Sequence, residues 1–290
     1  MLENSVNYCC ELLGRLPWEC MQYNFMQMAL LATIFLAPLT ATAGVQVVNY
    51  RMAFFADTIG HSVFAGAALG GIFLGANGPA WGMPITALLI GLGVLFLQKQ
   101  SKSSADTVIG VFFAFIVSLG LLLTGSNPDL AKLAGQFIFG DILLVTAQDT
   151  ALLALLSLIY VFFTTISCNA LLLISIDTDT AQAHRVKTTL YSYLHVSILS
   201  LIVIFTVKIT GVLLAGAMLI VPAAAARNLA KRAGSVYFYA AAIGLLSGIA
   251  GLIISAQDWA NFPAGAAMVM SSCIIFVLSL LRKKTDLPSK

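Results

Sequence analysis

An aspartate and a histidine stand four residues apart inside an apolar stretch of this 290-residue chain. Asp57 and His61 belong to the segment FFADTIGHSVFAGAALGG, and residues four apart share one face of an α-helix. A carboxylate and a neutral imidazole suit a borderline divalent cation such as Zn²⁺ or Mn²⁺. Two ligands from one helix leave the shell of such an ion incomplete, so a metal site here needs further donors, which a second copy of the chain could supply.

Both side chains are expected to lie deep in a membrane. They follow Arg51 by six and ten residues, which at about 1.5 Å per residue is roughly 9 to 15 Å into the bilayer. Ionisable groups there cost at least about 2.5 kcal/mol each to insert, so they are expected to face a cavity or a polar group and to mark a functional site. The alternative is that Asp57 and His61 only hydrogen-bond each other and hold two helices together.

The composition explains why the surroundings must be a membrane. Apolar residues make up 60% of the chain and charged residues 9%, whereas average soluble domains carry about a quarter charged residues. The charges cluster between apolar runs of about 18 to 25 residues, each long enough to cross a hydrocarbon core of roughly 30 Å as a helix. We therefore predict an all-α, polytopic membrane protein with eight or nine transmembrane helices. The expected spans cover about residues 25–48, 52–76, 83–98, 106–124, 150–172, 190–207, 211–226, 236–256 and 263–281.

Two places bear on the helix count and on the limits of the helices. The run 211–226 is short and contains Pro222, so it is either a ninth helix or a broken one. The string GANGPAWG before the third span is predicted to be a turn, because Gly78, Pro79 and Gly82 break helices.

The basic residues predict the orientation, because short cytoplasmic loops collect Lys and Arg. We expect an extracytoplasmic segment 1–22, a transmembrane domain 23–282 and a cytoplasmic tail 283–290. This orientation places twelve of the 15 basic residues on the cytoplasmic side. The expected location is the plasma or inner membrane, crossed many times, with lipid as a partner. The net charge of +3 is too small and too divided to indicate a nucleic-acid partner. The twelve are Arg51, Lys99, Lys102, Arg185, Lys187, Arg227, Lys231, Arg232, Arg282, Lys283, Lys284 and Lys290.

Three further features are interpreted from local patterns. In SIDTDTAQAHRVKT, Asp177 or Thr178 is expected to cap a short helix toward Val186, a shape that offers a contact for a cytoplasmic partner; the alternative is a solvated loop. Gly66 and Gly70 allow close helix approach, more often within a chain than in a dimer. The block GVLLAGAMLIVPAAAARNLAKR favours tight packing rather than gating.

These stretches together resemble a known family. The strings QYNFMQMALLA, MAFFADTIGHSVFAGAALG and GVLLAGAMLIVPAAAARNLA, with the late Pro263–Gly265, are similar to the permease subunits of ABC importers for zinc, manganese and iron, the ABC-3 family. The similarity runs from about Gln22 to Arg282.

The resemblance implies a type II ABC importer permease, with 23–282 as the permease domain. Its implied partners are a second permease copy, as a homodimer or a paired permease, a cytoplasmic ABC ATPase and an extracytoplasmic metal-binding protein. In similar proteins the proposed metal ligands of the second helix match Asp57 and His61 here, and the ATPase-contacting helix matches the region Thr178–Lys187. The residues to which it assigns ATPase coupling are Thr178, Ala181, Ala183, His184, Arg185 and Val186.

The expected function is therefore transport rather than catalysis. The string Gly-Lys never occurs, so the chain has no G-x-x-x-x-G-K-[ST] loop, and ATP hydrolysis must belong to a separate subunit. The transported ion is zinc or manganese, with iron as a further candidate, and no permanently bound cofactor is expected. The alternatives are a proton-coupled secondary metal carrier and a nontransporting membrane scaffold. His184 and His195 are interpreted as structural or interfacial, and Asp106 as a helix-start residue.

Overall fold

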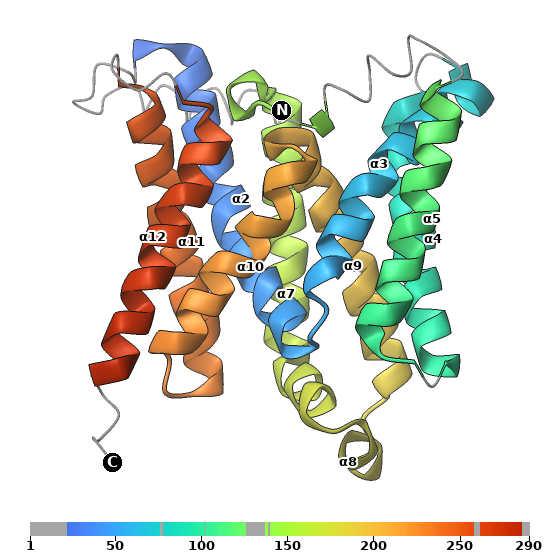
Figure 1. Ribbon diagram of the computed structural model, residues 1–290. Helices are drawn as coiled ribbons and strands as arrows, with labels where there is room; N and C mark the ends of the chain where they lie inside the picture. The colour runs from blue at the N-terminus through green and yellow to red at the C-terminus, as the bar shows by residue number, and fades with distance from the viewer. Residues whose placement is uncertain are drawn as a thin grey trace. The chain divides into compact units, whose positions relative to one another are not determined.

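The computed structural model describes residues 22–75, 78–101, 103–125, 137–138, 140–257 and 262–285 (Figure 1). Within them the chain is all-helical, and nine helices are long and apolar enough to cross a membrane. The predicted fold class is confirmed, with the larger of the two helix counts. Most of the predicted terminal segments 1–22 and 283–290 lies outside the described residues, so their limits stay predictions.

The helices follow the apolar runs closely, and the run containing Pro222 is one continuous helix of 18 residues. Two short helices, η3 (Ile142–Leu144) and α8 (Thr178–Ala183), accompany the spans. The spans are α2 (Asn24–Asn49), α3 (Ala53–Leu74), α4 (Gly78–Gln100), α5 (Ala105–Gly125), α7 (Ala147–Ile176), α9 (Thr188–Thr210), α10 (Val212–Leu229), α11 (Ala233–Ser255) and α12 (Ala264–Thr285).

The start of α4 corrects the sequence-based expectation. The segment with Gly78, Pro79 and Gly82 was predicted to be a turn, but these residues form the first turns of α4. Pro79 is tolerated because a first-turn residue has no intrahelical partner for its backbone nitrogen. The glycines are needed because α3 lies against this end of α4: a Cβ on Gly66 would lie 2.9 Å from the carbonyl oxygen of Gly82, and Gly70 meets Gly78 more closely still.

The Gly66 and Gly70 spacing is thus used within the chain, as the intrachain interpretation expects. Without side chains at these positions, the backbones of α3 and α4 approach each other directly, which favours dispersion contacts between membrane helices. This contact fixes one side of α3, the helix that carries Asp57 and His61.

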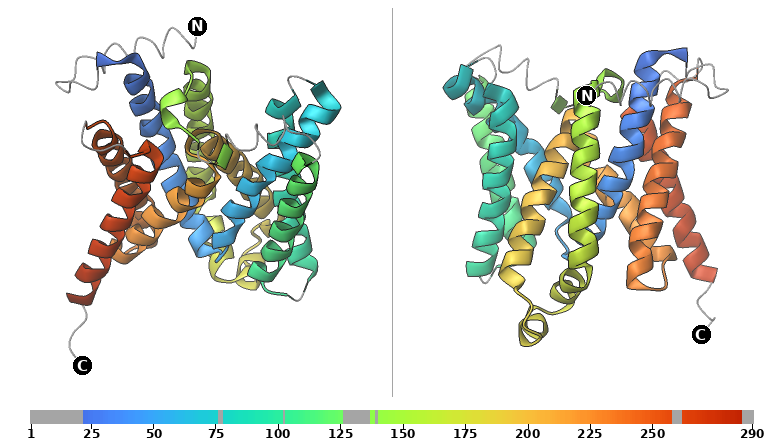
Figure 2. Two further views of the ribbon diagram at one scale, coloured as in Figure 1. Left: turned by 45° about the horizontal axis from the view of Figure 1, so that its top comes forward. Right: turned by 180° about the vertical axis from the view of Figure 1, so that it is seen from behind.

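The described helices divide into two compact units. One unit comprises Gln46–Gly140 and Phe162–Gly216, and in it α3 lies beside α4 and α5 while α9 packs against α3 and α4 (Figures 1 and 2). The other unit comprises Met1–Val45, Asp141–Val161 and Ala217–Lys290, and in it α11 packs against α12. All residues predicted to bind metal or to contact an ATPase belong to the first unit, which we call the site unit.

The second unit is held by small residues in the same way. A Cβ on Gly244 of α11 would lie 2.6 Å from the carbonyl oxygen of Ala37 in α2, and Gly44 of α2 lies against the backbone of Leu219 in α10. The Tyr160 hydroxyl of α7 donates a hydrogen bond of 3.3 Å to the backbone carbonyl oxygen of Thr42 in α2. Close backbone contact, supported by a few hydrogen bonds, therefore stabilises this unit.

Replacing Gly70 by alanine is expected to destabilise the contact between α3 and α4. The new methyl group would overlap the backbone of Gly78, which cannot turn aside as a side chain can, and overpacking of this kind costs about 1–3 kcal/mol. Thermal unfolding in detergent should show a lower midpoint for Gly70→Ala. The matched control is Gly110→Ala in α5, where an added Cβ meets nothing within 4 Å; equal midpoints for the two variants would contradict the packing explanation.

Candidate metal site

Asp57 and His61 are the fifth and ninth residues of α3. The helix is regular across them, so their side chains leave the same face about 6 Å apart along its axis. Both side chains are half-buried. The structure thus places the predicted pair on one helical face, as its spacing indicated.

The pair lines a groove of about 550 Å³ in the site unit. Three helices form the walls: α3 contributes the pair itself, α5 contributes Asp106 at its first turn and Phe113 two turns later, and α10 contributes Val212 and Leu213. Asp106 is a helix-start residue, as interpreted from the sequence, but it also faces this groove. Local sequence gave no sign of that, because the wall forms only when α5 packs against α3.

Neither member of the pair has a polar partner among the residues that the structure describes. Within the described part of the chain, no hydrogen bond or ion pair involves the Asp57 carboxylate or the His61 imidazole, so the two do not bond each other as the alternative interpretation supposed. The His61 ring makes edge-to-face contacts with Phe113, at 5.1 Å between ring centroids, and with Phe64, at 5.6 Å. Aromatic packing therefore orients the imidazole and leaves its nitrogens available to a ligand.

The Asp57 carboxylate lies against the backbone of α10. A Cβ built on Gly216 would lie 3.3 Å from Cγ of Asp57. The sequence indicated that the block around Gly216 packs tightly, but not that its neighbour would be the candidate ligand. No sequence signal distinguishes this glycine from the other small residues of the block, because the contact joins residues 159 positions apart.

The described part of the chain holds no complete set of metal ligands around the pair. Within the described residues, no group of three or more His, Cys, Asp or Glu side chains could hold a metal ion. Asp106 shares the groove with the pair but does not complete a ligand group with it. The further donors that a metal site here needs are therefore not found beside the pair in the described part of the chain, and the site stays a prediction.

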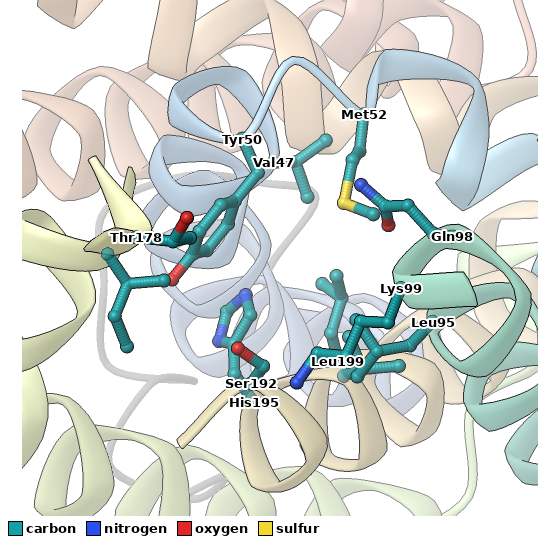
Figure 3. Close-up of a pocket in the computed structure, with 12 residues that line it drawn as sticks. Val47, Tyr50, Met52, Leu95, Gln98, Lys99, Thr178, Ser192, His195 and Leu199 are labelled. Atoms are coloured by element: carbon teal, nitrogen blue, oxygen red, sulfur yellow. The ribbon is translucent and has the colours of Figure 1, made fainter. Parts of the chain in front are cut away.

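A second cavity of the site unit, of about 180 Å³, lies near the start of α8 (Figure 3). His195 of α9 is buried at its edge, between the rings of Tyr50 at 5.8 Å and Phe163 at 6.5 Å, and neither ring nitrogen has a hydrogen-bond partner in the described part of the chain. Lys99 carries the only full charge among the lining residues, and its ammonium lies 5.1 Å from the ring centroid of Tyr193. A cationic, largely apolar lining disfavours a divalent cation, so this histidine packs rather than binds metal.

The predicted cytoplasmic helix is α8, which projects between α7 and α9 (Figure 1). The Asp177 carboxylate caps it by accepting hydrogen bonds from the backbone N–H groups of Asp179, at 3.2 Å, and Thr180, at 3.1 Å, and from the Thr180 hydroxyl. These hydrogen bonds lower the pKa of the Asp177 carboxyl, and the bond from the Thr180 hydroxyl has the largest effect. The sequence-predicted cap is confirmed.

The six residues assigned to ATPase coupling lie on α8 and directly after it. Four of them are exposed, Ala181 is buried and Val186 is half-buried. Arg185 adopts a left-handed backbone conformation with φ of 58°, which turns the chain from α8 toward α9. The exposed four, available to a partner, are Thr178, Ala183, His184 and Arg185.

The sequence profile of the ABC 3 transport family matches residues 22–283. The chain belongs to this family. It is 31% identical over 262 residues to the high-affinity zinc uptake system membrane protein ZnuB of Haemophilus influenzae, covering 88% of this chain and 97% of that protein. It is 28% identical over 264 residues to the manganese transport system membrane protein MntC of Listeria monocytogenes, covering 90% and 91%.

A solved structure shares the fold. The complex of PsaBC from Streptococcus pneumoniae with a Fab contains a chain that superposes with a TM-score of 0.75 at 26% identity, covering 92% of this chain and 93% of that one. The chain described here, as a member of the ABC-3 family, is thus a multi-pass plasma-membrane permease subunit of an ABC transporter, and it is not itself an enzyme.

Replacing His195 by phenylalanine is expected to leave the permease stable and active. The ring keeps its place between two aromatic neighbours, the cavity has room for the larger side chain, and two unpartnered nitrogens are removed. The free energy of unfolding should therefore change by less than about 1.5 kcal/mol. Thermal unfolding and cellular metal accumulation measure the two effects, and loss of accumulation with normal stability would show that His195 is more than a packing residue.

Proposed function

We propose that this chain is the permease of an ATP-driven importer for a divalent transition metal, and that Asp57 and His61 hold the ion during its passage. Zinc and manganese are the leading candidates, because the relatives ZnuB and MntC are named for their transport, with iron as a third. The observation that supports the site most directly is the unpartnered carboxylate and imidazole on one face of α3, lining a groove.

The chemistry of the pair fits a transient metal site. A divalent cation beside Asp57 compensates the cost of keeping a carboxylate in a low-dielectric groove, and His61 offers a neutral nitrogen ligand. A second permease copy, or a paired permease, adds its own donors and completes the shell. Because neither copy holds enough ligands alone, separating the two sets of donors releases the ion.

Two further kinds of subunit complete the proposed importer. ATP hydrolysis belongs to a cytoplasmic ABC ATPase, which we place against the exposed residues of α8, and an extracytoplasmic metal-binding protein delivers the ion. A proton-coupled secondary carrier is the competing proposal, since a carboxylate and an imidazole also relay protons. Uptake that stops when the ATPase subunit is inactivated favours the importer; uptake by the chain alone, driven by a proton gradient, favours the carrier.

The scaffold alternative is the weaker one. It requires the polar pair to lock helices together, whereas the described structure contains no hydrogen bond between Asp57 and His61. Helix association is provided by the glycine contacts between α3 and α4 instead.

Replacing Asp57 by asparagine is expected to abolish metal uptake without unfolding the permease. The amide keeps the shape of the side chain but loses the charge that a divalent ion requires, and we expect uptake to fall by at least about tenfold, as for substitutions around metal ligands. Metal accumulation is measured in cells that lack their own uptake systems, with the variant quantified in the membrane. His61→Phe should act similarly, with His195→Phe as its matched control. Normal uptake by Asp57→Asn would remove the basis of the proposed site.

Replacing Asp177 by alanine is expected to uncouple transport from ATP hydrolysis. The cap of α8 is lost, the helix frays, and the metal transported per ATP should fall at least about twofold. The measurement is uptake and hydrolysis by the reconstituted complex. Asp177→Asn is the control, because asparagine also caps helices; unchanged coupling in Asp177→Ala would exclude α8 as the contact.

The same cap predicts a simple pH dependence. Because the folded-state pKa of Asp177 is lowered, its contribution is complete above the ordinary carboxyl pKa and is lost only as the pH falls through the lowered value. The ratio of metal transported to ATP hydrolysed should therefore show no Asp177-dependent change between about pH 5 and pH 8.

A further inference from the structure

We propose that Gly216 of α10 is a positioning residue of the metal site, because its missing side chain leaves the space that the Asp57 carboxylate occupies. The inference rests on the proposed role of Asp57 as a ligand. It goes further by assigning the residue that fixes where this carboxylate lies relative to His61, and so which ions the pair accepts.

The geometry at this position is specific to the carboxylate. A Cβ built on Gly216 would overlap Oδ1 of Asp57 and would lie 3.3 Å from Cγ and 3.7 Å from Oδ2. All three atoms of the carboxyl group therefore face this point of α10. The residue at position 216 is buried, so an added side chain cannot turn toward solvent.

Gly216 differs in this respect from several other closely packed glycines. Added atoms on Gly44, Gly70 and Gly140 would meet backbone of a neighbouring segment, which cannot move without disturbing the fold. At Gly216 the atoms that must move belong to the end of one side chain. A methyl group there is therefore expected to displace the carboxylate while the helices stay in place.

The displacement would change the spacing of the two candidate ligands. No hydrogen bond holds the Asp57 carboxylate in the described structure, so its packing against Gly216 is the contact that positions it. The His61 ring is held separately, by Phe113 and Phe64. A shift of one ligand with the other fixed alters the distance and angle offered to an ion, and zinc and manganese differ in the geometry they prefer.

The test uses the complete transporter, permease with its ATPase, in lipid nanodiscs. Binding of Mn²⁺ and of Zn²⁺ is titrated separately, and the Mn²⁺ electron paramagnetic resonance spectrum reports the ligand geometry. The variants are Gly216→Ala, Asp57→Asn and their combination. The control is Gly234→Ala in α11, where an added Cβ meets nothing within 4 Å.

We expect Gly216→Ala to keep the wild-type unfolding midpoint, to bind both ions about 10- to 100-fold more weakly, as for other residues that orient a ligand, and to change the ratio of the two dissociation constants and the Mn²⁺ spectrum. In the Asp57→Asn background, the same change should cause no further loss, because the group it displaces is no longer a ligand. Gly234→Ala should behave as wild type.

Three results would overturn the inference. The first is wild-type affinity and ion preference in Gly216→Ala while Asp57→Asn binds measurably more weakly than wild type, which would leave the proposed function intact. The second is a further loss of equal size in the Asp57→Asn background. The third concerns stability. If Gly216→Ala lowers the unfolding midpoint, adding Asp57→Ala should restore it, because the clashing carboxylate is then gone. A midpoint that stays low would show that the added methyl group meets something other than Asp57. Wild-type binding by Asp57→Asn would instead defeat the proposed function itself.

Discussion

The desolvation of two ionisable side chains is the constraint around which the site unit is built. Asp57 and His61 stand within a membrane helix, half-buried and without a hydrogen-bonding partner in the described chain. Such groups are retained in membranes only where something compensates their cost. In the proposed function, an ion that arrives and leaves through the groove walled by α5 and α10 satisfies this requirement without a permanent partner.

Small residues make the arrangement possible by letting backbones come close on both sides of α3. Gly66 and Gly70 fix α3 against α4, and Gly216 brings α10 onto the Asp57 carboxylate. Membrane helices gain little from the hydrophobic effect on association, so close packing is what sets their positions. Glycines thus support the fold at one end of α3, through backbone contact, and shape the candidate site at the other, through contact with a side chain.

Features that depend on neighbouring residues could be predicted from the sequence, and those that depend on distant contacts could not. The apolar runs predicted the spans, the four-residue spacing put Asp57 and His61 on one face, and the residue that caps α8, Asp177, was one of two candidates. The prediction for the start of α4 was wrong, because packing onto α3 overrides the turn preference of Gly78 and its neighbours. The groove walls and Gly216 were missed because they arise only when helices far apart in the chain meet.

The contacts also connect α8 with the pair through a single helix. α9 follows α8 directly, packs against it and also packs against α3. Gly60, which lies between Asp57 and His61, faces this helix: an added Cβ would lie 3.4 Å from a side-chain carbon of Val207 of α9, at ordinary van der Waals distance. In the proposed function, α9 is therefore the helix that connects the ATPase contact on α8 with the helix that carries the pair.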